Sequence, residues 1–274
     1  MDSGRRQGID RARGGGCPGL TLTLAEALGI VADDVVALVG GGGKTTAMFR
    51  LAREIAERGE HALTTTTTHI AGEQIALAPA HLGAGEATRD RIVAALTAHR
   101  HVLVAGPIDA VTGRAAGIST ELFSRLREWC PAVCLINEAD GSRRLPFKAP
   151  SEHEPVIPSE TTLVVPVVGA DVLGAPLDDA HVHRLERVRA ITGASAGARV
   201  TPEIVARVLA HPLGGLKSVP AGARVVVVIN KVDLLEDREP ARETAERLLH
   251  EPAIASVVLA AAGGDKPVLE VCTR

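Results

Sequence analysis

The sequence predicts an α/β fold in which a mainly parallel sheet lies between two layers of helices. Short runs of β-branched residues alternate with segments of helical periodicity, which is typical of strands joined by crossover helices. The strand segments are apolar throughout, as expected for strands that are buried on both faces. A glycine-rich turn also joins the first strong strand to the first long helix.

Hydrophobic spacing, with Gly and Pro at the segment ends, predicts each element in turn. The predicted strands span residues 35–39, 61–68, 101–105, 132–137, 161–168, 224–229 and 255–260. The predicted helices span residues 45–58, 87–99, 119–129, 182–190, 201–210 and 239–250. Two Pro- and Gly-rich segments, 145–158 and 211–223, predict loop insertions at the rim of the sheet.

Composition excludes several classes of protein. With 46% hydrophobic and 23% charged residues, the 274-residue chain is globular, and no apolar run approaches the roughly 18–20 residues of a membrane span. A net charge of −3 and 1% aromatic residues argue against a nucleic-acid partner. Residues 1–19 lack the apolar core of a secretory signal, so we expect a flexible leader before one domain at 20–274. Four scattered cysteines without a C-x-x-C pair then favour a cytoplasmic protein with reduced thiols.

The glycine-rich turn carries the strongest functional signal. It follows a buried strand and opens a helix, so that backbone N–H groups and the positive helix end surround phosphate oxygens. Lys44 would reach the β- and γ-phosphates, and the Thr45 hydroxyl would bind Mg²⁺. The pattern predicts a P-loop NTPase-like three-layer sandwich with the nucleotide at the carboxyl ends of the strands. The predicted phosphate-binding residues are Gly40, Gly41, Gly42, Gly43, Lys44, Thr45 and Thr46.

Acidic residues end the strand at 132–137. Either Glu138 or Asp140 would hold Mg²⁺ and act with Lys44 in catalysis, and the Gly141 amide would sense the γ-phosphate. Threonines end the strand at 61–68, at a position that faces the γ-phosphate in P-loop folds. Thr66 and Thr67 are therefore candidates to join Mg²⁺ or to orient water, although β-branched strand filling explains them equally well.

An N-K-x-D motif follows the strand at 224–229 and predicts guanine specificity. The Asp233 carboxylate would accept hydrogen bonds from guanine N1–H and N2–H₂, and the Lys231 stem would lie along the base. Asn230 completes the motif. The expected nucleotide is GTP, with ATP as the alternative.

Other clusters have competing interpretations. Arg143, Arg144 and Lys148 follow the acidic motif and would neutralise a transferred phosphoryl group, unless they lie in a solvated loop. The segment 152–154 and the pair at 181 and 183 have spacings compatible with metal binding, but exposed loops explain them better. Cys130 and Cys134 flank the start of a buried strand and are expected to be inert core residues rather than carriers of sulfur or selenium.

Several long motifs together resemble one family, that of the selenium-dependent hydroxylase accessory proteins. The matching segments are GGGGKTT (40–46), the five threonines at 64–68, EADGSRRLPFKAPSEHEPVIP (138–158), VGADVLGAPL (168–177), VHR (182–184), GGLK (214–217) and INKVD (229–233). The resemblance implies a role in maturing molybdenum hydroxylases that carry a labile selenium ligand. It implies as partner such a hydroxylase or its cofactor-maturation machinery. A more distant similarity links the chain to GTPases that assist nickel and cobalt centre assembly.

These observations together predict a Mg²⁺-dependent nucleotide-binding accessory protein, with GTP hydrolysis favoured over ATP hydrolysis. Two alternatives stay open at the level of sequence. One is an ATP-dependent ligase, since similar loops open ligases that activate carboxylates. The other is an adaptor that binds the nucleotide without hydrolysing it, since no residue stands out as a general base.

Overall fold

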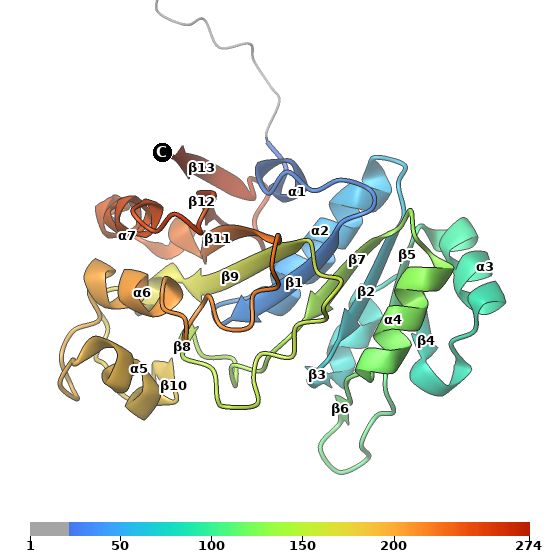
Figure 1. Ribbon diagram of the computed structural model, residues 1–274, viewed down its shortest axis with the longest axis horizontal. Helices are drawn as coiled ribbons and strands as arrows, with labels where there is room; N and C mark the ends of the chain where they lie inside the picture. The colour runs from blue at the N-terminus through green and yellow to red at the C-terminus, as the bar shows by residue number, and fades with distance from the viewer. Residues whose placement is uncertain (1–21) are drawn as a thin grey trace, which may run out of the picture.

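Nine strands form one sheet in the computed structural model, which describes residues 22–274 (Figure 1). The leader predicted at 1–19 lies outside the described residues. The strand order is β13-β12-β11-β9-β1-β7-β2-β5-β4, and all neighbours pair in parallel except β12 and β13. The strands of this sheet are β1 (Val35–Gly40), β2 (Ala62–Thr66), β4 (His81–Gly83), β5 (His101–Ala105), β7 (Cys134–Glu138), β9 (Leu163–Gly169), β11 (Arg224–Asn230), β12 (Ser256–Ala260) and β13 (Val268–Thr273).

All seven predicted strands are present, with ends that differ by up to two residues. The sheet edges β4 and β13 were not predicted, because short or half-exposed strands lack a continuous apolar run. Two small sheets lie outside the main one. They pair β3 (Ile70–Ala71) with β6 (Arg114–Ala115) and β8 (Phe147–Lys148) with β10 (Val182–His183).

The predicted helices are also present, with one correction. The helix expected at 182–190 begins only at Leu185, because Val182 and His183 pair with β8 and Arg184 has a left-handed backbone conformation (φ +64°). The α-helices are α1 (Leu24–Ala27), α2 (Lys44–Glu57), α3 (Arg89–His99), α4 (Thr120–Trp129), α5 (Leu185–Thr192), α6 (Pro202–Leu209) and α7 (Glu239–Leu249). The 3₁₀ turns are η1 (Gly72–Leu77), η2 (Ala84–Glu86), η3 (Ala170–Val172) and η4 (Val232–Leu234). Among the described residues, none of the helices combines the length and the apolar character that a membrane crossing requires.

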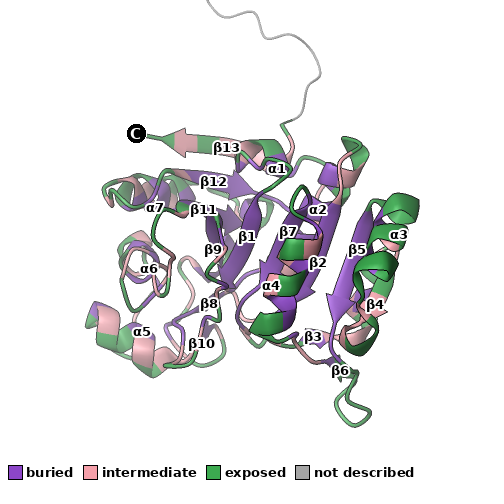
Figure 2. Ribbon diagram, turned by 45° about the vertical axis from the view of Figure 1, so that its right-hand side comes forward, coloured by how far each residue is buried: buried purple, intermediate pink, exposed green. Residues whose placement is uncertain are grey.

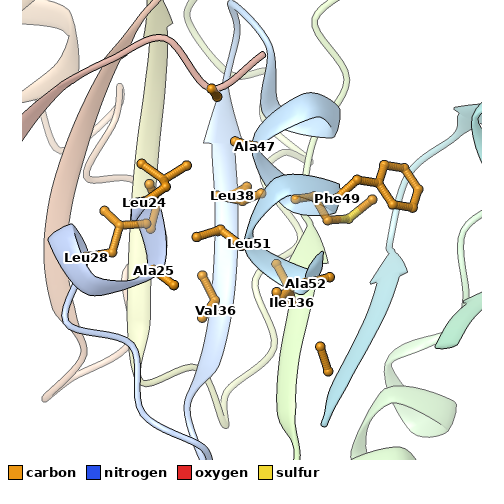
Figure 3. Close-up of a cluster of buried hydrophobic side chains, with 14 of the residues drawn as sticks. Leu24, Ala25, Leu28, Val36, Leu38, Ala47, Phe49, Leu51, Ala52 and Ile136 are labelled. Atoms are coloured by element: carbon orange, nitrogen blue, oxygen red, sulfur yellow. The ribbon is translucent and has the colours of Figure 1, made fainter. Parts of the chain in front are cut away.

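Helices cover both faces of the sheet, as the three-layer prediction requires. On one face α1 and α2 pack on β1, where Leu24 and Leu51 lie near Val36 and Leu38 (Figure 3). On the other face α6 and α7 pack over β9, β11 and β12, while α3 and α4 pack over β2, β5 and β7. The central strands are buried on both sides (Figure 2), which explains their continuous apolar sequences.

The two predicted loop insertions contact each other. The Lys217 side chain, from the segment 211–223, donates hydrogen bonds to the backbone carbonyls of Ser151, Glu152 and Glu154 at 2.5–2.8 Å. The segment 145–158 in turn contacts the glycine-rich turn, since the Gly42 N–H donates to the Leu145 carbonyl at 3.1 Å. The insertions therefore support the loop at the carboxyl edge of the sheet.

One buried histidine predicts how stability varies with pH. His101, at the start of β5, is 3% exposed, and burial lowers its pKa from 6.5 to about 4. As the pH falls the unfolded chain takes up this proton first, so this contribution to stability is complete above pH 6.5 and is lost between 6.5 and 4. Between pH 7.5 and 5, we expect the His101→Gln protein to lose about 2 kcal/mol less free energy of unfolding than the wild type does. Urea unfolding of this variant and of the exposed control His250→Gln measures the effect, and an unchanged pH dependence in His101→Gln would contradict it.

Candidate functional site at the phosphate loop

The turn between β1 and α2 has a backbone that only glycine permits. Gly40, Gly42 and Gly43 have φ values of +95°, +77° and +113°. A Cβ atom on Gly42 would lie 1.9 Å from the Gly169 nitrogen, so the turn packs directly on the end of β9. No side chain caps the first turn of α2, which leaves its N–H groups available to an anion.

Lys44 is buried at the amino end of α2, between two carboxylates. Its Nζ donates to the Gly40 carbonyl at 2.6 Å and lies 3.2 Å from Asp140 and 3.6 Å from Glu138. Burial by itself would lower the pKa of Lys44, but the Asp140 and Glu138 carboxylates outweigh it, and the pKa is raised. The ammonium group therefore keeps its charge at neutral pH.

The two acidic candidates have different environments. Glu138 ends β7 and accepts a hydrogen bond from the Thr45 hydroxyl at 2.7 Å. Asp140 is 1% exposed, and its two oxygens accept the Gly40 N–H at 3.1 Å each and pair with Lys44 and Lys148. Asp140 thus holds the phosphate loop in place, while Glu138 and Thr45 present adjacent oxygens.

Asn230 connects the phosphate loop to the loop after β12. Its Nδ2 donates to the Gly42 carbonyl at 2.9 Å, and its Oδ1 accepts the Ala262 N–H at 2.9 Å. The next residue, Lys231, pairs with Asp171 at 2.7 Å. Asp233 lies in η4 and is exposed. Asn230 therefore bridges to the phosphate loop and Lys231 lies at the same edge of the sheet, whereas Asp233 is not among the residues that line the cleft there.

The two strand-end threonines donate to the backbone. The Thr66 hydroxyl donates to the Glu138 carbonyl at 3.0 Å, and the Thr67 hydroxyl donates to the Val156 carbonyl at 2.9 Å. Thr67 also lies beyond the end of β2. These bonds tie β2 to β7 and to the segment 145–158, so the geometry gives both threonines a positioning role.

A cleft of about 850 Å³ opens at this edge of the sheet. Lys44, Thr45 and Glu138 line it together with Gly141 and Lys231. Residues from three segments that are distant in the sequence thus converge at the carboxyl ends of parallel strands, where α/β folds bind their ligands.

A family model described as YqeC protein matches residues 36–186, which is more than half of the chain. An Escherichia coli (strain K12) protein named uncharacterized protein YqeC is 33% identical over 210 residues, covering 74% of this chain and 78% of its own length. The chain belongs to the YqeC family. This is the selenium-dependent hydroxylase accessory family that its motifs resemble.

Solved structures resemble this YqeC-family chain more distantly. Chloroplast FtsY from Physcomitrella patens is 14% identical with a TM-score of 0.44, and the alignment covers 93% of this chain and 66% of that one. FlhF complexed with GTP and Mg²⁺ is 13% identical with a TM-score of 0.39, covering 92% and 75%. Because both TM-scores are below 0.5, the P-loop NTPase-like fold is assigned from the sheet order and the phosphate loop of this chain.

Contacts in this YqeC-family chain show where other candidate side chains lie. Lys148 does not face the cleft, because it is 3% exposed and pairs with Asp140 and Glu154. Within residues 22–274, no cluster of three or more His, Cys, Asp or Glu side chains is arranged to hold a metal ion. His181 instead pairs with Asp178 at 2.7 Å.

The thiols at 130, 134 and 272 are not activated. Burial raises the pKa of each of them, most strongly that of Cys134. A raised pKa disfavours the thiolate, which is the nucleophilic form.

Asp171 was not predicted from the sequence, and Glu154 was considered only as part of a metal-compatible segment. Asp171 pairs with Lys231, and Glu154 accepts from both Lys148 and Arg184 at 2.8 Å. Both lie inside the family motifs, but neither has a spacing that reveals its partner.

Proposed function

We propose that this chain is a Mg²⁺-dependent P-loop nucleotide-binding protein that prefers GTP, hydrolyses it, and acts as an accessory factor in maturing selenium-dependent molybdenum hydroxylases. The observation that carries the nucleotide part is the meeting of Lys44, Thr45 and Glu138 in a cleft over uncapped helix N–H groups. The accessory role is supported by membership of the YqeC family.

Phosphate binding requires only a local change at Lys44. Its Nζ would leave the Gly40 carbonyl and bind the β- and γ-phosphates, while the first N–H groups of α2 donate to the same oxygens. Asp140 keeps its bonds to Gly40 and Lys148 during this change, so the loop keeps its shape. Gly141 lines the same cleft, and its amide N–H would respond to the γ-phosphate.

The donor set at the cleft suits Mg²⁺. The Thr45 hydroxyl and the Glu138 carboxylate are hard oxygen ligands on adjacent elements, 2.7 Å apart, and Mg²⁺ typically takes one or two protein oxygens beside the phosphates. We assign Glu138 rather than Asp140, because the Asp140 oxygens are already shared by Gly40 and two lysines. When bound, the ion would neutralise charge on the phosphates.

Guanine preference depends on Asp233. We expect Asp233→Ala to weaken GTP binding at least about 100-fold, since it removes two hydrogen bonds to a charged acceptor at roughly 1.5–3 kcal/mol each, and to leave ATP binding unchanged. Calorimetric titration with both nucleotides in the presence of Mg²⁺ measures this, with Glu236→Ala as an exposed control on the same loop. Equal loss for GTP and ATP would remove the guanine assignment and leave the nucleotide assignment intact.

Hydrolysis and the accessory role need separate tests. Phosphate release from GTP in a single turnover, with and without the purified hydroxylase, tests whether the protein is a switch enzyme or an adaptor. For the cellular role, deletion of the gene should lower the selenium content of the hydroxylase, and Lys44→Ala should fail to restore it. Cys134→Ser should restore it, because the raised pKa of this buried thiol does not suit a chalcogen carrier. Failure of a folded Cys134→Ser protein would overturn the indirect role.

A further inference from the structure

A second cavity, of about 650 Å³, adjoins the nucleotide cleft. The two share Gly141 and the side chains of His69, Arg114 and Arg143 as walls. The second cavity extends away from the phosphate loop toward the start of α5, where Arg184 and Arg187 line it. It is therefore a separate space that begins at the position proposed for the γ-phosphate.

Four arginines from three separate segments line this cavity. Arg143 is exposed, and among residues 22–274 it has no hydrogen bond or ion pair that would occupy its guanidinium. Within the described part of the chain, the Arg114 side chain donates only to the His69 carbonyl, and Arg187 lies 3.4 Å from the exposed Glu152. Much of the donor capacity of these arginines is therefore available to a ligand.

The acidic groups of the wall leave this cavity with a net positive charge. Glu154 is neutralised by Lys148 and Arg184, each at 2.8 Å, which leaves Asp179 and Glu186 as the remaining carboxylates. His183 also lies at this wall. Burial, with the positive charges of Arg184, Lys148 and Arg143, lowers its pKa to about 4.

The backbone places two of these arginines at a conformational cost. Arg143 and Arg184 have φ values of +52° and +64°, which arginine adopts rarely and glycine adopts freely. Such strain is concentrated at functional positions, where the side chain is used. Arg184 is also the N-cap of α5, where no side chain caps the helix, so the positive end of the helix lies at the wall.

A chain of alternating charges, buried from Lys44 to Lys148 and partly exposed at its far end, holds this wall against the phosphate loop. It runs from Lys44 to Asp140, Lys148, Glu154 and Arg184, with successive distances of 3.2, 3.0, 2.8 and 2.8 Å. The arginine pocket and the nucleotide cleft are thereby fixed relative to each other by charge-assisted bonds.

We propose that the pocket lined by Arg114, Arg143, Arg184 and Arg187 binds a second, small-molecule ligand through a phosphate-type tetrahedral oxyanion, beside the γ-phosphate of the nucleotide. Arginine suits this chemistry because its planar fork donates two parallel hydrogen bonds to an oxyanion. The position beside a γ-phosphate rests on the proposed nucleotide function, whereas the anion site itself rests on the pocket.

Inorganic phosphate is the probe for this site. The full chain is first saturated with Mg²⁺ and a slowly hydrolysed GTP analogue, which fills the phosphate loop, and phosphate is then titrated by calorimetry at constant ionic strength. We expect one phosphate to bind, with affinity at least about ten-fold weaker in Arg143→Ala/Arg187→Ala, since each charged hydrogen bond contributes roughly 1.5–3 kcal/mol. Arg189→Ala is the matched control, because Arg189 lies on the same helix and donates to the Ala194 carbonyl.

The two proposals fail in different ways. Absence of phosphate binding when the loop is filled, or equal affinity in the double variant and the wild type, overturns the second site and leaves the nucleotide proposal standing. If the GTP analogue itself does not bind, the nucleotide proposal fails. Phosphate is then titrated into the wild type, the double variant and the control without nucleotide, and weaker binding in the double variant alone shows that the arginines form an anion site. Unchanged thermal unfolding of the double variant shows that it is folded.

Discussion

Lys44→Ala is expected to weaken the binding of Mg²⁺-nucleotide at least about 100-fold. The ammonium would donate to two phosphate groups, and hydrogen bonds between charged partners contribute roughly 1.5–3 kcal/mol each. The structure keeps this group charged, since the neighbouring carboxylates raise the pKa of Lys44 despite its burial. The affinity for GTP and ATP is measured by calorimetry in excess Mg²⁺.

The control for this variant is Lys266→Ala, which removes one exposed ammonium and therefore has the same net charge as Lys44→Ala. Thermal unfolding of both variants separates a loss of binding from a loss of folding. A folded Lys44→Ala protein that binds either nucleotide within a few-fold of the wild type would exclude the phosphate-loop assignment.

Asp140→Ala is expected to lower the free energy of unfolding by about 3–5 kcal/mol, the usual cost of removing one partner from a buried ion pair. The Asp140 side chain is 1% exposed, and its removal would leave Lys44 and Lys148, at 2% and 1% exposure, without their shared carboxylate. The Gly40 N–H would also lose its acceptor. Urea unfolding at pH 7 measures the change.

Asp171→Ala provides the comparison for Asp140→Ala. It removes a carboxylate from the more exposed pair with Lys231, where we expect a loss of at most about 1 kcal/mol. If the two variants lose equal stability, the buried chain of charges is not the element that holds the phosphate loop.

The order of the elements was predictable from sequence because its causes are local. Continuous β-branched runs mark strands that are buried on both faces, and the spacing of apolar residues marks α2 and α4. The phosphate loop is local too, because the positive φ values at Gly40, Gly42 and Gly43 are accessible to glycine with little strain. The start of α5 was predicted too early, since pairing of Val182 with Phe147 depends on a segment 35 residues away.

The division of roles within the site was decided only by tertiary structure. Glu138 and Asp140 are both carboxylates and lie two residues apart, so the sequence does not distinguish them. The directions of their side chains depend on how the loop after β7 packs on the phosphate loop. Lys148 was a candidate to neutralise a transferred phosphoryl group, but in the folded chain it is buried between Asp140 and Glu154.

The sequence by itself thus determined the class of fold and the glycine-rich turn after β1, because hydrophobic periodicity and glycine conformations act over a few residues. Tertiary structure alone decided which charges meet. Arg114, Arg143 and Arg184 lie on segments that are distant in the chain, and no spacing relates them. They converge because the loops that follow parallel strands lie at one edge of the sheet. At that edge, each charged side chain from Lys44 to Arg184 has an oppositely charged neighbour, which offsets the cost of its desolvation.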